Sequence, residues 1–215
     1  TYNIRYDAAE DPENWKDRKY KVQSIIQQEN LDLIGMQECL HHQMSDLEAL
    51  LPEYKWIGLG REGGSKGEYT PIFYKKDRFR VLEYDHFWLS DTPYTIASRT
   101  WGNEITRIAT WVRLFDERSG EQFYHMNTHL DHVSQTARTE SAALIHQQLS
   151  DLKSSLFLLT GDFNLGYSSE VHTYLTKEAE LVDVWDAAAK KENEQYGSFN
   201  DFRDPTGGED RIDWI

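Results

Sequence analysis

The chain has 215 residues, a net charge of −14 and an isoelectric point near 4.9, with 39% hydrophobic and 13% aromatic residues. This length and composition fit one domain with a sizeable core, the single cysteine argues against a disulfide framework, and no apolar run reaches the roughly 20 residues that a membrane span requires. The acidic balance argues against a protein that grips long duplex DNA, because such proteins neutralise phosphates with Lys and Arg.

The first predicted elements place an amide and then a carboxylate on strands. Thr1–Arg5 alternates in polarity like a half-buried strand, with Asn3 on its polar face. Tyr20–Glu29 has apolar residues at helical spacing and predicts a helix. The mostly apolar run Leu31–Glu38 then predicts a buried strand, which delivers the carboxylate of Glu38 at its end.

Two residues in the middle of the chain have both a binding and a packing interpretation. Tyr69 precedes a predicted strand, Ile72–Lys75, and either lines a cleft or packs in the core. Arg107 opens a run of alternating polarity, where we favour a structural ion pair over a contact with substrate.

The segment Phe123–His132 predicts a strand that is rich in histidine. Strand alternation puts His125, Asn127 and His129 on one face. Histidines suggest zinc, but the chain has no HExxH motif and the other candidate ligands are oxygen donors. We therefore predict that His125 is a core histidine and that His129, at the end of the strand, contacts substrate.

The most informative stretch is Leu156–Asn164, an apolar run followed by a glycine and then an acid and an amide two positions apart. Asp162 and Asn164 fall at or just past the C-terminal end of the predicted strand, where α/β sheets place ligand sites. Such oxygen donors suit a hard cation or a phosphoryl group, although an Asx turn gives the same pattern. The predicted helix Ser134–Lys153 precedes this strand, so the unit resembles the helix and strand before Glu38.

The last run, Arg211–Ile215, predicts another strand with a carboxylate, Asp213, in its middle. An acid inside an apolar strand is costly to bury unless it is paired, so we expect a specific partner for Asp213. We also expect the oxygens of Glu38, Asp162 and Asn164 to surround one hollow together with the imidazole of His129.

Five motifs in this order resemble the endonuclease/exonuclease/phosphatase superfamily: TYN, MQE, NTHLDH, GDFN and RIDWI. They cover the whole chain. The residues in and around these motifs are most similar to those of bacterial members whose substrates are loosely defined. The resemblance implies a DNase I-like α/β (α+β) fold, a four-layer sandwich of two packed mixed β-sheets flanked by helices. It also implies divalent-metal-dependent hydrolysis of phosphoesters, with Mg²⁺ or Mn²⁺ as the cofactor.

The resemblance further implies which residues bind metal and substrate. Glu38 matches the principal metal ligand, and Asn3 matches an amide that lines the metal and phosphate site. Tyr69 lies where the family often places a residue that contacts substrate. Asp131 and His132 are distinctive of this subgroup, and we expect them to contact substrate as well.

Four further residues match the catalytic positions of the superfamily. His129 matches the residue that binds the scissile phosphate. Asp162 matches the acid that orients or deprotonates the attacking water, and Asn164 matches the amide that stabilises the phosphoryl group. Asp213 matches the carboxylate that hydrogen-bonds a later histidine.

The chain departs from the family pattern in one respect. The Ser-Asp-His motif that normally supplies this later histidine does not occur. We therefore expect a single domain, residues 1–215, that is cut at both ends and whose catalysis is impaired, since the histidine would stabilise developing negative charge. If the lack of the motif is natural, the alternative is a non-catalytic binding module on the same fold.

The acidic charge favours a small molecule or a short nucleic acid as the phosphoester substrate. A phosphodiesterase or phosphatase is the leading interpretation, and a 3′-to-5′ exonuclease or deadenylase-like nuclease is the alternative. We expect a monomer. A cytoplasmic and a secreted location both stay open, because a signal peptide would precede the residues given.

Overall fold

The computed structural model describes residues 1–152, 156–202 and 210–215. The strands are β1 (Tyr2–Asn3), β2 (Leu33–Gln37), β3 (Tyr54–Ile57), β4 (Ile72–Lys75), β5 (Phe79–Trp88), β6 (Ile108–Asp116), β7 (Gln122–His129), β8 (Phe157–Asp162) and β9 (Asp213–Trp214). The helices are α1 (Trp15–Gln28), α2 (His41–Leu50), α3 (Gln135–Asp151), α4 (Glu170–Lys177) and α5 (Val184–Ala187). No helix within the described residues is both long and apolar enough to cross a lipid bilayer.

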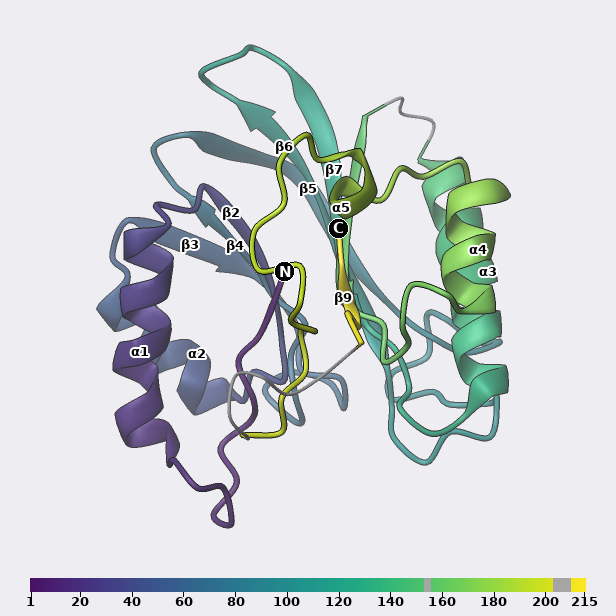
Figure 1. The fold of residues 1–215 in the computed structure, drawn as a ribbon, viewed down its shortest axis with the longest axis horizontal. Coiled ribbons are helices and arrows are strands. Elements are labelled where there is room, and N and C mark those ends of the chain that lie inside the picture. Colours follow the sequence, from purple (N-terminus) through teal and green to yellow (C-terminus); the bar gives the residue numbers. More distant parts are fainter. Residues whose placement is uncertain (153–155, 203–209) are drawn as a thin grey trace.

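The strands form two mixed sheets that lie between two layers of helices (Figure 1). The order is β1-β2-β4-β3 in the first sheet and β5-β6-β7-β8-β9 in the second. The pairs β1–β2 and β7–β8 are parallel, and the other pairs are antiparallel. Helices α1 and α2 cover the first sheet, and α3 and α4 cover the second (Figure 1). The predicted four-layer sandwich is confirmed.

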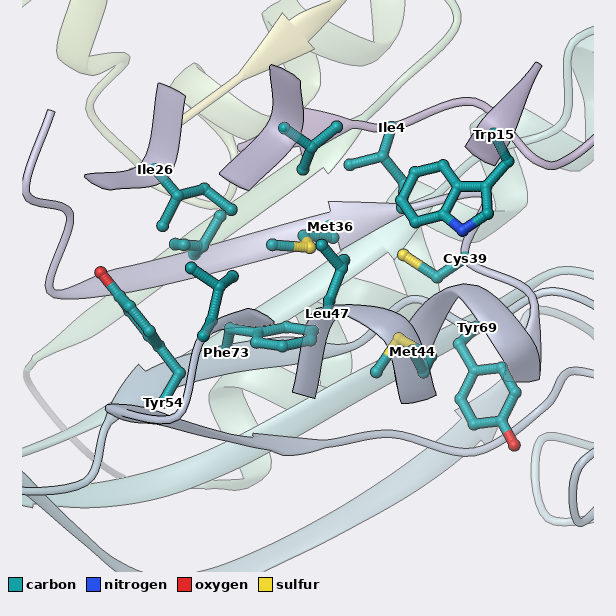
Figure 2. Packing of buried hydrophobic residues seen from close by; sticks show 13 residues of the cluster. Ile4, Trp15, Ile26, Met36, Cys39, Met44, Leu47, Tyr54, Tyr69 and Phe73 are labelled. Carbon is teal, nitrogen blue, oxygen red and sulfur yellow. The ribbon is translucent and has the colours of Figure 1, made fainter. Parts of the chain in front are cut away.

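Helix α1 begins at Trp15, five residues before the start that the sequence predicts. Asn14 caps it by accepting a hydrogen bond from the Asp17 backbone N–H at 3.2 Å. The charged first turn conceals the helical period, yet Trp15 is buried on the same face as Val22 and Ile26. Figure 2 shows this face packing with residues of α2 and β2 in one apolar cluster.

On the second sheet, α3 begins where the sequence predicts. Ser134 caps the helix by accepting a hydrogen bond from the Ala137 N–H at 3.1 Å, and Ile145 and Leu149 are buried against the sheet. The end that we predicted for this helix, Lys153, lies outside the described residues.

Between the sheets, a buried polar network joins β2 to β7 and β8. Asn127 donates hydrogen bonds to the carbonyl oxygens of Met36 and Pro71, at 2.6 and 2.9 Å. Its Oδ1 accepts hydrogen bonds from Gln37 at 2.7 Å and from Thr160 at 3.0 Å. Because buried amides must be paired, these bonds fix how the two sheets align at the ends of their central strands.

Gly35 allows the sheets to approach at this network. A Cβ at this position would lie 2.1 Å from Thr160 Oγ1 and 2.5 Å from Asn127 Oδ1. His125 is the core histidine that we predicted: it is fully buried, and its Nε2 lies 2.8 Å from Thr160 Oγ1. Burial lowers the pKa of His125 to about 3, so it is neutral.

Candidate active site at the strand ends

The central strands of both sheets deliver polar side chains to one place. Asn3 ends β1, Glu38 follows β2, His129 ends β7 and Asp162 ends β8. One ligand atom from each of Glu38, His129 and Asp162 lies within 4.8 Å of the others. Residues that are distant in the sequence therefore form one cluster, and Asp213 joins it by pairing with Asp162 across β8 and β9.

Asn3 links the two carboxylates of the cluster. Its Nδ2 donates to Glu38 Oε1 and to Asp162 Oδ2, each at 2.9 Å, while its Oδ1 accepts from the Arg5 backbone N–H at 2.9 Å. The amide nitrogen thus faces the carboxylates and the amide oxygen is occupied. Direct metal ligation by Asn3 stays a prediction, and the contact that the structure gives is a bridge between two acids.

Glu38 adopts a left-handed backbone conformation, with φ of 59°. For a residue other than glycine such a conformation costs on the order of 1–3 kcal/mol and persists only where the surroundings impose it. Here the Tyr6 backbone N–H donates to Glu38 Oε2 at 3.2 Å, and Arg5 Nη1 lies 3.8 Å from the same oxygen. The carboxylate of Glu38 is therefore oriented from both sides.

Asp162 forms the Asx turn that the sequence pattern gave as the alternative to a ligand site, and its second oxygen still faces the cluster. Its Oδ1 accepts from the Asn164 backbone N–H at 3.0 Å, while Oδ2 faces Asn3 and lies 3.7 Å from His129 Nε2. Burial raises the pKa of Asp162, and the proximity of Glu38 raises it further. One oxygen of this carboxylate thus has a structural role while the other lies in the site.

Asn164 lies just beyond β8 with φ of 53°, a conformation that asparagine tolerates. Its Nδ2 donates to the Leu130 carbonyl oxygen at 3.0 Å, which ties the end of β8 to the end of β7. The predicted contact with a phosphoryl group would use the second N–H of the same amide.

His129 is neutral in this site. Burial lowers the pKa of His129 well below its usual value, and the nearby cations Arg107 and Arg61 lower it further. The contact with Asp162 is therefore not an ion pair at neutral pH. A neutral imidazole keeps one N–H, which suits donation to a phosphate oxygen.

Asp213 is half-buried beside Asp162, and the hydrogen-bond partner of its side chain is Ser198. Within the described ranges its Oδ1 forms no hydrogen bond, and its backbone N–H donates to Ser198 Oγ at 3.1 Å. Burial raises the pKa of Asp213 to about 7, and the charge of Asp162 contributes to the rise. The hydrogen bond with the Ser198 side chain opposes this rise but leaves Oδ1 without a partner among the described residues.

Two of the predicted substrate contacts are engaged within the protein. Tyr69 is buried, packs edge-on against Trp56 at 6.0 Å and has its hydroxyl 3.3 Å from the Gly64 carbonyl oxygen. Asp131 is also buried, and its Oδ2 accepts from the N–H groups of Val133 and Ser134 at 3.0 and 2.7 Å. Contact of either residue with substrate stays a prediction.

Arg107 lies beside the site, where the sequence interpretation expected a structural ion pair. Its Nε is 3.6 Å from Asp131 Oδ1, and its Nη2 is 3.0 Å from Nδ1 of His132, a further predicted substrate contact. The ion pair exists, but the guanidinium also acts on His129 and Asp162. Arg107 lies just before β6, the strand that pairs with β7, and its predicted place at the opening of this strand was the one sequence signal of the proximity.

The Endonuclease/Exonuclease/phosphatase family matches residues 1–215. Among solved structures, the chain is similar to an endonuclease/exonuclease/phosphatase from Bacteroides vulgatus, with 38% identity and a TM-score of 0.94 over 99% of this chain and 83% of that one. It is similar to a mannosyl-6-phosphatase from Bacteroides thetaiotaomicron, with 33% identity and a TM-score of 0.92 over 99% and 82%. The human Nocturnin catalytic domain shares the fold, at 18% identity and a TM-score of 0.75 over 99% and 78%.

Among curated proteins, the chain is similar to an uncharacterized protein of Acanthamoeba polyphaga mimivirus, with 29% identity over 161 residues. The match covers 70% of this chain and 59% of the viral protein, so it spans less than two thirds of that relative. The match over residues 1–215 and the similarity in structure agree with the clustered acids at the strand ends. The chain belongs to the endonuclease/exonuclease/phosphatase family.

Proposed function

We propose that this protein hydrolyses a small phosphoester with the help of a divalent metal ion held at Glu38. The members of the family are hydrolases of phosphoester bonds. The observation that carries the proposal is the convergence of Glu38, His129 and Asp162, whose ligand atoms lie within 4.8 Å of one another.

The donor set of the cluster fits Mg²⁺ or Mn²⁺. Glu38 and Asp162 offer carboxylate oxygens on either side of one Asn3 amide, and oxygen ligands are those that Mg²⁺ prefers. Burial raises the pKa of Asp162 and the charge of Glu38 raises it further, and a cation held at Glu38 would offset that charge. When bound, such an ion polarises phosphoryl oxygens and offsets the negative charge that develops during hydrolysis.

The protein side chains would supply positioning and proton transfer. Asp162, whose pKa is raised, suits a general base that takes a proton from the attacking water. His129, as a neutral imidazole, would donate its N–H to a phosphate oxygen, and Asn164 would donate the free N–H of its amide. Asp213 lies next to Asp162 and would tune the charge of the base rather than touch substrate.

A small phosphorylated molecule is the substrate class that we favour. The mannosyl-6-phosphatase is 33% identical and covers nearly the whole chain, whereas Nocturnin, at 18%, supports only the fold. The net charge of −14 also disfavours a long polyanion. A sugar phosphate therefore fits better than a nucleic acid.

The experiment is a panel of phosphoesters assayed on the protein expressed from its full gene, with Mg²⁺, Mn²⁺ or EDTA. The panel contains hexose phosphates, a phosphodiester and a short RNA. We expect hydrolysis of at least one small phosphoester that EDTA abolishes and that Glu38→Gln loses. Cleavage of RNA alone would favour the nuclease alternative, and hydrolysis of nothing in the panel would favour the binding module.

A further inference from the structure

Next to His129, three separate segments enclose a small cavity whose lining includes charged side chains. The loop between β3 and β4 contributes Arg61 and Glu68, the residue just before β6 is Arg107, and β7 contributes His129 itself. The cavity therefore holds two guanidinium groups and one carboxylate directly beside the residue proposed to bind phosphate. This concentration of cations contrasts with a net charge of −14 for the whole chain.

Arg107 is held rigidly without being fully paired. The residue is only 4% exposed, and its Nη2 contacts His132 Nδ1 at 3.0 Å. The nearest acid, Asp131, lies 3.6 Å from Nε, but its Oδ2 already accepts two backbone N–H groups. Within the described ranges, Nε of Arg107 is buried and forms no hydrogen bond. A buried guanidinium with an N–H that lacks a partner can donate a hydrogen bond to an anionic ligand.

Arg61 is placed by a closed loop. Its backbone N–H donates to the Glu68 carbonyl oxygen at 2.9 Å, and its Nη1 forms an ion pair with Glu68 Oε2 at 2.9 Å. Its Nε, like that of Arg107, is buried and has no hydrogen-bond partner among the residues described. Glu68 pairs with Arg61 and also acts on Arg107, whose second acidic neighbour is Asp131. Each arginine nevertheless keeps an Nε–H without a hydrogen-bond partner among the described residues, beside His129.

We propose that Arg61 and Arg107 bind the phosphoryl oxygens of the substrate and make the site selective for phosphomonoesters over phosphodiesters. This inference rests on the proposed function and names its substrate class. A monoester carries about −1.5 to −2 charges at pH 7 and three unesterified oxygens, whereas a diester carries one charge and two such oxygens. Two guanidinium forks match the monoester in both charge and geometry.

The same geometry gives Asp131 and His132 a role through Arg107. Both contact the guanidinium, at 3.6 and 3.0 Å, and the carboxylate of Asp131 is anchored to the chain leading into α3. They would act as positioning residues that fix the direction of the guanidinium, and the direct substrate contact that their motif suggested stays a prediction.

The test compares two chromogenic substrates with the same leaving group, p-nitrophenyl phosphate and bis(p-nitrophenyl) phosphate, in the presence of Mn²⁺. We expect the monoester-to-diester ratio of kcat/KM to fall at least about tenfold in Arg61→Gln and Arg107→Lys, as the loss of a charge-assisted hydrogen bond predicts. Arg80→Gln is the control, because this arginine pairs at 3.0 Å with Glu117, is 58% exposed and does not line the cavity. Its ratio should equal that of the wild type.

A titration of inorganic phosphate by calorimetry separates the two proposals. We expect phosphate affinity to weaken at least about tenfold in Arg61→Gln, relative to Arg80→Gln, even if the wild type hydrolyses neither ester. Absence of hydrolysis in the wild type would contradict the proposed function alone. Unchanged ratios and unchanged phosphate affinity in Arg61→Gln, in a protein with wild-type Tm, would overturn the inference whether or not Arg107→Lys folds.

Discussion

The two halves of the sandwich present their acids in different ways. In the first half, α1 and β2 lead through Gly35 to Glu38, and in the second half, α3 and β8 lead through Gly161 to Asp162. Glu38 stands on a left-handed backbone beyond its strand, with a side chain 16% exposed, beside the cation of Arg5. Asp162 ends its strand with a side chain only 5% exposed.

This difference shows how one arrangement of elements supports two kinds of carboxylate. The Glu38 oxygens accept hydrogen bonds from the N–H groups of Asn3 and Tyr6, which orient this carboxylate for the binding of a cation. Asp162 is desolvated and lies near another acid, which raises its pKa and suits proton transfer. The assignment of ligand to one half and base to the other makes testable predictions.

The largest effect is expected from Asp162→Asn. Loss of a general base lowers rates by about 10²–10⁴-fold, so kcat should fall in that range on whichever phosphoester the wild type hydrolyses. The Asx turn survives, because an asparagine Oδ1 can still accept from the Asn164 N–H. Steady-state kinetics would measure kcat, and a thermal melt would check that the fold is retained. A near wild-type rate would remove Asp162 from the mechanism.

Alanine substitutions at Gly35 and Gly161, the glycines of the two halves, are expected to lower the free energy of unfolding by different amounts. A Cβ at Gly35 would meet Thr160 Oγ1 at 2.1 Å, inside the buried network, whereas a Cβ at Gly161 would meet Thr128 Cγ2 and Thr128 O at 2.9 Å. Overpacking of this kind costs about 1–3 kcal/mol, and we expect Gly35→Ala to lie at the upper end and above Gly161→Ala. Urea denaturation measures the difference. Equal unfolding free energies for Gly35→Ala and the wild type would show that the sheets are not tightly joined there.

A smaller effect is expected from Asn164→Gly. Glycine keeps the positive φ of 53° and the N–H that Asp162 accepts, and removes only the amide side chain. If that amide contacts the phosphoryl group, kcat/KM should fall about tenfold, in line with one lost hydrogen bond. Unchanged kcat/KM would restrict Asn164 to its structural bond with the Leu130 carbonyl oxygen.

A further effect is expected in the pH dependence of stability. The pKa of Asp213 is about 7 in the folded state and about 3.9 for an unfolded aspartate, so the folded state binds more protons between these values. Stability is therefore lost as the pH rises from about 4 through 7. The Tm measured without metal should fall over this range more steeply in the wild type than in Asp213→Asn. Parallel curves would show that Asp213 does not carry this dependence.

The sequence predicted the elements that carry the site because each combines an apolar run with a terminal polar residue. The runs before Glu38 and Asp162 are buried strands, and the alternation around His125 assigns its face correctly. The start of α1 at Trp15 was missed because its first turn is highly charged. Burial of that tryptophan depends on the sheet beneath it, which a local pattern does not contain.

The contacts within the site are less predictable, because they depend on tertiary packing. The order of the residues does not show that the nitrogen of Asn3 faces two acids, or that the carboxylate of Asp131 is occupied by backbone N–H groups. Nor does it show that Arg107, the residue just before β6, lines the same cavity as His129. Each of these depends on the register between strands far apart in the chain.

The central claim is that Glu38 holds a divalent metal ion while Asp162 serves as base at the same centre. Calorimetric titration of Mn²⁺ at pH 7 into the wild type, Glu38→Gln and Asp162→Asn tests this claim most directly. We predict that Glu38→Gln weakens Mn²⁺ binding at least about tenfold, whereas Asp162→Asn retains most of the affinity despite its loss of activity. Wild-type Mn²⁺ affinity in Glu38→Gln, together with retained hydrolysis, would contradict the account.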